Sequence, residues 1–201
     1  MQHNIVMEIK KTKQQLLDEL YAPYQKCLQC PLGFLGRTNV VFGEGNPNTK
    51  LLFIGEAPGR DEDEQGRPFV GRSGKLLTKA LELAGINRDD VYITNIVKCR
   101  PPNNRKPLPI EITTCTNILL INQIKIIQPA LICPLGSVAL TTLLGPDYKI
   151  TKTRGTILPK EEFLILPVYH PSYVLRNQSM LPVFFQDIKA IKNHLIKLSL
   201  S

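Results

Sequence analysis

The chain has 201 residues, of which 43% are hydrophobic, and it carries a formal net charge of +8 at pH 7. This length suits one α/β domain (residues 1–201), and the composition is that of a globular protein with a sizeable core. No apolar run approaches the length of a membrane span, and the first residues, MQHNIVMEIKKTKQQ, lack the features of a signal peptide. We therefore expect a cytoplasmic protein, and its basic charge favours a polyanionic partner such as nucleic acid.

The first half of the chain predicts two helices and two strands. Leucines recur at helical spacing in residues 11–22, whereas residues 33–48 are rich in Gly and Asn and indicate loop or short strands. Residues 51–55 (LLFIG) are a short continuous apolar run, as in a buried parallel strand. A polar loop then leads to a helix at 75–84 and to a second strand at 91–97.

The second half continues the alternation, with helices at 110–127 and 137–144, strands at 130–134 and 163–168, and a last helix at about 183–198. Strands that alternate with helices predict an α/β fold, a three-layer α/β/α sandwich around a central four-stranded parallel sheet. Ligands of such sheets bind beyond the carboxyl ends of the strands. Three polar loops leave those ends, at 55–71, 98–105 and 170–177, and we expect the functional residues there.

Five cysteines are present, and an odd count without a secretion signal argues against a disulfide framework. Cys27 and Cys30 form a CxxC pair that can chelate a metal, and Cys99 and Cys115 could complete the ligand set. Iron–sulfur, zinc, a redox pair and no metal all remain open at this point, although a redox pair usually follows a strand and this one precedes the first. Cys133 lies in an apolar strand, where we expect a core residue.

Three long motifs now point to a family. GEAPG (55–59) with EDEQGRPFVGRSG (62–74), TNIVKCRPPNNRKP (94–107) and HPSYVLRN (170–177) resemble the signatures of the family-four uracil-DNA glycosylases. The resemblance runs from about residue 27 to 177 with the motifs in the expected order. It implies a monomer that cuts uracil from single- or double-stranded DNA. It also implies a four-iron, four-sulfur cluster on Cys27, Cys30, Cys99 and Cys115, with zinc as the less favoured occupant.

The resemblance assigns three residues to the base pocket. Phe69 would stack on the extruded uracil, although a core Phe is the alternative. Asn95 would pair with uracil O4 and N3–H and reject cytosine, which reverses both groups, although an Asn at a strand end is often a turn residue. His170 would donate to O2 as negative charge develops there, the alternative being a buried structural His.

Further residues of the first motif complete the predicted pocket. Glu56 would stabilise the cationic sugar or position the attacking water. Glu62, or less favourably Asp63, would exclude the thymine methyl group. Gly55 and Ala57 are further expected base contacts, and Ala57 stands where the family-one glycosylases carry their catalytic Asp.

DNA contacts are expected on the same rim. Leu175 would enter the helix as an apolar wedge, and Arg176 would hold a phosphate. Ser73 and Gly74 would present backbone N–H groups to a phosphate. Neighbouring cations that could add to this face are Arg72, Lys75, Arg100 and Arg105.

Two other readings compete with the glycosylase. A non-catalytic iron–sulfur or zinc DNA-binding module would not need the set formed by Glu56, Asn95 and His170. A phosphate-handling α/β enzyme could use the GEAPG loop, but the sequence has neither GxxxxGK[ST] nor a strand–GxGxxG–helix fingerprint.

Overall fold

A six-stranded mixed sheet forms the centre of the computed structural model, which describes residues 11–160 and 162–200. The strand order is β1-β3-β2-β4-β6-β5. The strands are β1 (Glu44–Gly45), β2 (Leu51–Gly55), β3 (Tyr92–Asn95), β4 (Leu131–Pro134), β5 (Leu158–Lys160) and β6 (Phe163–Ile165). The four inner strands run parallel, as predicted, whereas β1 and β5 pair antiparallel at the two edges. The predicted sheet was therefore right in its core and lacked two short edge strands.

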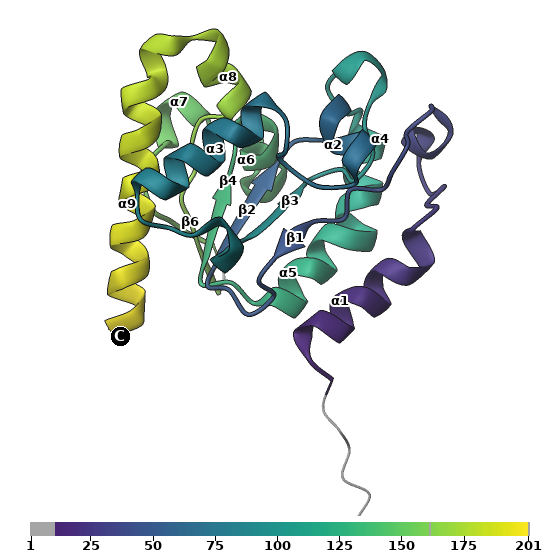
Figure 1. Cartoon of the computed structure of the whole chain (residues 1–201), viewed down its shortest axis with the longest axis horizontal. Helices are drawn as coiled ribbons and strands as arrows, with labels where there is room; N and C mark the ends of the chain where they lie inside the picture. The colour runs from purple at the N-terminus through teal and green to yellow at the C-terminus, as the bar shows by residue number, and fades with distance from the viewer. Residues whose placement is uncertain (1–10, 161, 201) are drawn as a thin grey trace, which may run out of the picture.

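Helices cover both faces of this sheet, which confirms the three-layer sandwich (Figure 1). The helices are α1 (Lys13–Tyr21), α2 (Arg60–Gln65), α3 (Arg72–Leu83), α4 (Pro109–Cys115), α5 (Ile121–Ile127), α6 (Ser137–Leu144), α7 (Ile150–Thr153), α8 (Pro171–Arg176) and α9 (Leu181–Leu200). A π-helical turn, Thr116–Leu120, joins α4 to α5. Single 3-10 turns lie at Ala22–Tyr24, Pro31–Phe34, Arg88–Asp90, Pro102–Asn104 and Gln178–Met180. Helices α3, α8 and α9 pack on one face, and α1, α5 and α6 on the other.

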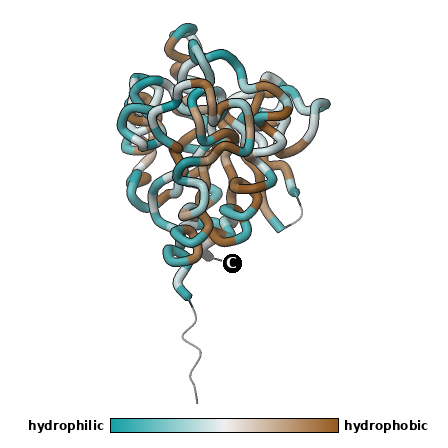
Figure 2. Tube along the Cα trace, turned by 90° about the vertical axis from the view of Figure 1, so that its right-hand side faces the viewer, coloured by the Kyte–Doolittle hydropathy of each residue, from teal (hydrophilic) through white to brown (hydrophobic). Residues whose placement is uncertain are grey.

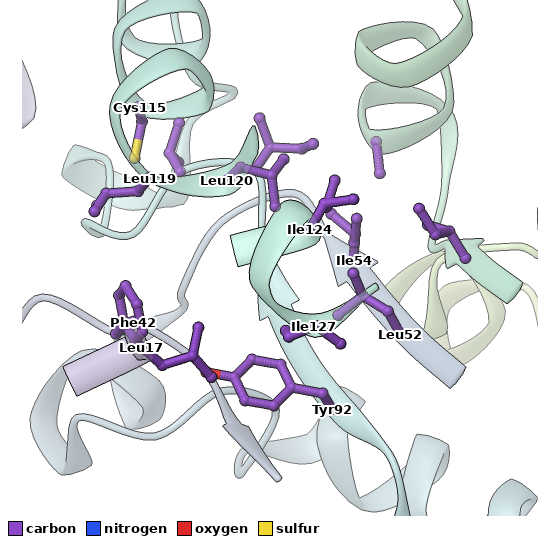
Figure 3. Close-up of a cluster of buried hydrophobic side chains, with 14 of the residues drawn as sticks. Leu17, Phe42, Leu52, Ile54, Tyr92, Cys115, Leu119, Leu120, Ile124 and Ile127 are labelled. Carbon is purple, nitrogen blue, oxygen red and sulfur yellow. The ribbon is translucent and has the colours of Figure 1, made fainter. Parts of the chain in front are cut away.

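Side-chain alternation along the buried strands supplies both halves of the core. In β2, Leu52 and Ile54 contact the α1–α5–α6 layer, whereas Leu51 and Phe53 contact the α3–α8–α9 layer. All four are buried, and burial of one such side chain contributes about 1.5–3 kcal/mol. Figure 3 shows side chains of the half that packs against the α1–α5–α6 layer. Figure 2 shows hydrophobic segments gathered towards the interior.

One helical segment corrects an expectation about membranes. Pro109–Ile127 is long and apolar enough to cross a membrane by length and composition, although no such run was predicted. In the structure Leu119 and Ile124 of this segment pack in the core (Figure 3), and its Glu111 and Gln123 are buried with hydrogen-bond partners. These contacts are those of a core helix. The prediction that no signal peptide is present concerns mainly residues 1–10, which lie outside the described residues.

Two short helices stand where loops were expected, and both shape the rim beyond the strand ends. Helix α2 has the sequence RDEDEQ, which offers no apolar periodicity, and α8 consists of only six residues. Helix α3 begins at Arg72, three residues before the predicted start. The rim is therefore more ordered than the sequence indicates.

Candidate functional site

A cleft of about 980 Å³ opens beyond the carboxyl ends of β2, β3 and β4. This is where ligands of parallel α/β sheets bind, and the size is that of a small-molecule pocket. The cleft is lined by six cationic side chains and three carboxylates, so its balance favours an anion. The predicted site residues that line it are Glu56, Ala57, Glu62, Phe69, Ser73, Asn95, His170 and Arg176.

Gly55 brings an aromatic ring and an amide together at the floor of the cleft. A methyl group on Gly55 would lie 2.3 Å from Asn95 Oδ1 and 2.5 Å from Phe69 Cζ. Gly55 and Asn95 are also direct partners in the β2–β3 ladder. Only a glycine leaves both groups in place, although Gly55 itself is not among the residues that line the cleft.

Phe69 holds an unusual backbone conformation at this point. Its φ is 54°, in the left-handed region that costs a non-glycine residue on the order of 1–3 kcal/mol. Gly74 of α3 lies so close that a methyl group there would meet the Phe69 carbonyl. The close packing of α3 against this loop thus fixes the ring.

The side-chain oxygen of Asn95 is a buried acceptor without a partner. Asn95 is 1% exposed, and its Oδ1 and Thr116 Oγ1 are the buried side-chain polar atoms that lack a hydrogen bond in the described part of the chain. Such a group costs about 1–3 kcal/mol. Because Asn95 also lines the cleft, a ligand N–H group can supply the missing bond.

His170 is held as a neutral imidazole. Its Nδ1 accepts a hydrogen bond from the Ser172 backbone N–H at 3.1 Å and lies 2.8 Å from Ser172 Oγ. Burial, with a smaller contribution from the Arg176 charge, lowers the pKa of His170 to about 4. Above that pH the proton therefore sits on Nε2, which is a hydrogen-bond donor. The ring centroid lies 5.8 Å from that of Phe69.

Glu56 is the candidate base of the cleft. The residue is partly buried, and burial raises the pKa of its carboxyl group, an effect that the Lys106 charge opposes. A raised pKa in a cleft is typical of groups that exchange protons or stabilise charge.

Glu62, the predicted steric guard, lines the cleft and also joins two of its loops. Its carboxylate accepts three backbone N–H bonds, from Gly59 at 3.1 Å, Val70 at 3.0 Å and Gly71 at 2.8 Å. It therefore ties the GEAPG loop to the loop that carries Phe69. Asp63, the weaker candidate, is buried away from the cleft wall and accepts N–H bonds from the segment at residues 38–39.

Only some of the residues predicted to contact DNA line the cleft. Ser73, in the first turn of α3, and Arg176 line the cleft, whereas Leu175 is partly buried and does not. Tyr173, on the same helix as Leu175, is 38% exposed and lines the cleft. Its ring packs against that of Tyr169, with the ring centroids 5.0 Å apart.

Some contacts of this rim were not foreseen. The predicted surface cation Arg105 is paired instead with the buried Glu111, at 2.7 Å. Gly136 and Ser137, which directly follow β4, also line the cleft. Their place after a parallel strand was the signal that could have identified them.

The four cysteines of the predicted ligand set surround one small cavity. Cys27 and Cys30 come from the segment after α1, Cys99 follows β3, and Cys115 ends α4. Burial raises the pKa of Cys99 to about 12 and that of Cys115 to about 11. In the part of the chain that the structure describes, no group of three or more His, Cys, Asp or Glu side chains could hold a metal ion. Cys133 is fully buried in β4 and packs in the core, as predicted.

Comparison with known proteins identifies the family. The model of the uracil DNA glycosylase superfamily matches residues 42–195. The chain is 47% identical over 193 residues to the type-4 uracil-DNA glycosylase of Thermotoga maritima, covering 92% of this chain and 98% of that relative. The chain belongs to the type-4 uracil-DNA glycosylases.

Two further type-4 uracil-DNA glycosylases agree with this assignment. That of Sulfurisphaera tokodaii is 42% identical over 185 residues, 88% of this chain and 83% of the relative. That of Archaeoglobus fulgidus is 39% identical over 183 residues, 87% of this chain and 91% of the relative. The family predicted from the motifs is thus confirmed.

Proposed function

We propose that this chain flips uracil out of DNA and hydrolyses the N-glycosidic bond, leaving an abasic site for base excision repair. Its family is that of the uracil-DNA glycosylases, which are N-glycosyl hydrolases. The observation that carries the substrate assignment is the unpaired, buried Oδ1 of Asn95 in the cleft. Uracil N3–H matches this acceptor, and uracil O4 matches the amide N–H. Cytosine presents an acceptor at N3 and a donor at N4, so both contacts fail.

The remaining cleft residues have roles that follow from their chemistry. Phe69 provides the stacking face, and Nε2–H of the neutral His170 stabilises the negative charge that develops on uracil O2. A neutral imidazole suits this task because it can donate a hydrogen bond to O2 while its proton stays on the nitrogen. Glu56, as a carboxylate, stabilises the cationic sugar or aligns the attacking water. Ala57 lines the same wall.

We further propose a four-iron, four-sulfur cluster on Cys27, Cys30, Cys99 and Cys115. The donor set fits, because four sulfurs and an apolar shell that includes Leu32 surround one cavity. A zinc ion needs its thiolates about 2.3 Å from the metal. Among the described residues no group of three or more His, Cys, Asp or Glu side chains could hold a single metal ion, which favours a cluster over zinc. Its contribution is structural, since it joins the segment after α1 to β3 and α4.

The substrate is uracil-containing DNA, single- or double-stranded. Four cations of the cleft rim make no ion pair among the described residues and support phosphate binding: Arg72, Arg100, Lys106 and Arg176. We also propose that the chain forms one domain, is a monomer and acts in the cytoplasm.

The test uses the purified chain and a labelled oligonucleotide with one uracil, followed by alkali. We expect cleavage at uracil and none at thymine or cytosine in matched strands. Asn95→Ala should lower the single-turnover rate by about a hundredfold or more, while the iron–sulfur absorbance survives. A folded chain that binds DNA but never cleaves at uracil would instead be the non-catalytic binding module.

A further inference from the structure

Lys98 lies between the cysteine site and the amide of Asn95. Its side chain is 0% exposed, and it is the only buried lysine in residues 11–160 and 162–200. No carboxylate forms an ion pair with it within that part of the chain. A buried amine is costly unless its N–H groups are bonded, so its partners indicate what it holds in place.

The two acceptors of the amine belong to the residues that present the base-reading amide. Lys98 Nζ donates to the backbone carbonyl of Asn95 at 2.6 Å and to Thr94 Oγ1 at 2.6 Å. The Thr94 hydroxyl in turn donates to the Phe42 carbonyl at 2.8 Å. The amine is thus bonded directly to the peptide of Asn95 and to the residue before it.

The backbone of Lys98 is anchored at the other site. Its N–H donates to Cys115 Sγ at 3.4 Å, and its carbonyl accepts from Val41 N–H at 2.7 Å. The next residue in the chain is Cys99. One residue therefore contacts the cysteine site through its backbone and the base site through its side chain.

The turn between Asn95 and Lys98 explains why the amine affects the position of Asn95. Asn95 is the last residue of β3, and beyond it Ile96 and Val97 donate to the carbonyls of Gly55 and Glu56. These bonds pair the backbone N–H groups of Ile96 and Val97. The Asn95 carbonyl takes part in neither of them and accepts from Lys98 instead. The Asn95 carbonyl and the Ile96 N–H belong to one planar peptide group, which these bonds therefore hold on both sides. Without the amine, the carbonyl is unpaired in the core and the group keeps only its bond to Gly55, so the backbone that carries the Asn95 amide is less firmly held.

We propose that Lys98 is a positioning residue that fixes Asn95 in its base-reading orientation and makes that orientation depend on the cysteine site. The inference rests on the proposed function, because it takes Asn95 to read uracil. It assigns Lys98 no contact with substrate.

The first test compares Lys98→Met, which keeps most of the length of the side chain and removes its donors, with the wild type. We expect kcat/KM for uracil excision to fall at least tenfold. Affinity for DNA with an abasic site should stay within twofold, because that product has no base to read. The iron–sulfur absorbance should persist. The matched control is Lys125→Met, an exposed lysine on α5, which should behave as the wild type.

A double-mutant cycle tests whether Lys98 acts through Asn95. On an Asn95→Ala background, Lys98→Met should change the single-turnover rate less than twofold, because the amide that it positions is gone. A further tenfold loss on that background would overturn the inference. An equal loss of abasic-DNA affinity would also overturn it, since it would show general damage to the site.

Thr94→Val keeps the inference testable if Lys98→Met does not fold. It removes one acceptor of the amine and the bond to Phe42 at nearly constant volume, so we expect a smaller loss, about threefold to tenfold, again with unchanged abasic-DNA affinity. A wild type that excises no uracil contradicts the proposed function and this inference with it. A fully active Lys98→Met contradicts this inference alone.

Discussion

At the scale of single residues, the cleft shifts the pKa values of two ionisable groups in opposite directions. Burial raises the pKa of Glu56, whereas it lowers that of His170 to about 4. The two shifts keep His170 neutral at any pH above about 4 and make Glu56 easier to protonate than an ordinary Glu. Only Glu56 should therefore limit activity on the acid side of neutrality.

We accordingly predict one acid limb in the pH profile of kcat/KM for uracil excision. Ionised Glu56 is the active form, so activity falls as pH drops through a pKa that lies above the usual value near 4.3. Glu56→Gln should be slower by about a hundredfold and should flatten this limb, measured under single-turnover conditions with uracil in single-stranded DNA. A limb that persists unchanged in Glu56→Gln would assign the titration to another group.

Sequence reasoning located the residues that carry chemistry but not every partner they make. Asn95 ends β3, whereas Phe69 and His170 stand in loops, and the structure places all three in one cleft as expected. The backbone contacts of Glu62 could not be foreseen, because the N–H groups that it accepts from lie up to nine residues away. The same holds for Arg105, whose partner Glu111 is fully buried in the next helix.

At the scale of elements, α8 presents Tyr173 rather than Leu175 to the cleft. Tyr173 and Arg176 are three residues apart, share one helix face and line the cleft, whereas Leu175 lies off that face and is partly buried. The ring of Tyr173 is already held by Tyr169 and by the side chain of Asn177, whose Nδ2 donates to its hydroxyl at 3.2 Å. These two contacts hold the ring of Tyr173 in place in the cleft.

We predict that Tyr173→Ala lowers uracil excision from duplex DNA about tenfold or more but changes excision from single strands little, since only a duplex must be held open. Tyr173→Phe should retain most duplex activity because it keeps the ring. Leu175→Ala is the matched comparison and should have the smaller effect in the same assay. If Leu175→Ala gives the larger duplex defect, the wedge is Leu175, as the sequence alone suggested.

Long apolar elements were easier to predict than short ones for a physical reason. Three of the four parallel strands, β2, β3 and β4, are buried along their whole length, which favours continuous apolar runs such as LLFIG. Strand β1 has only two residues and β5 three, and both lie at sheet edges where no apolar pattern is imposed. Helix α2 is held by the backbone bonds of Glu62 rather than by an apolar face.

At the scale of the whole molecule, the cysteine site joins segments that are far apart in the sequence. The segment after α1, the end of β3 and the end of α4 meet there, and the last of these continues into the core helix α5. Loss of the cluster should therefore loosen the α1–α5 layer before the α3–α9 layer.

We predict that Cys99→Ser loses most of its iron and lowers the melting temperature by roughly 10 °C or more, because metal binding contributes directly to folding free energy. Iron analysis and thermal unfolding measure both effects. Cys133→Ala, the matched cysteine of the opposite layer, should keep its iron. Full iron content in Cys99→Ser would exclude this residue from the ligand set.

The unpaired oxygen of Asn95 also has a consequence for turnover. In the proposed recognition it accepts from an N–H group of the base, and neither the sugar nor a phosphate takes part in that contact. Free uracil, the leaving product, carries the same N–H group and would satisfy the same acceptor. The proposal therefore predicts that free uracil inhibits the reaction and that turnover slows when the released base escapes slowly from the cleft.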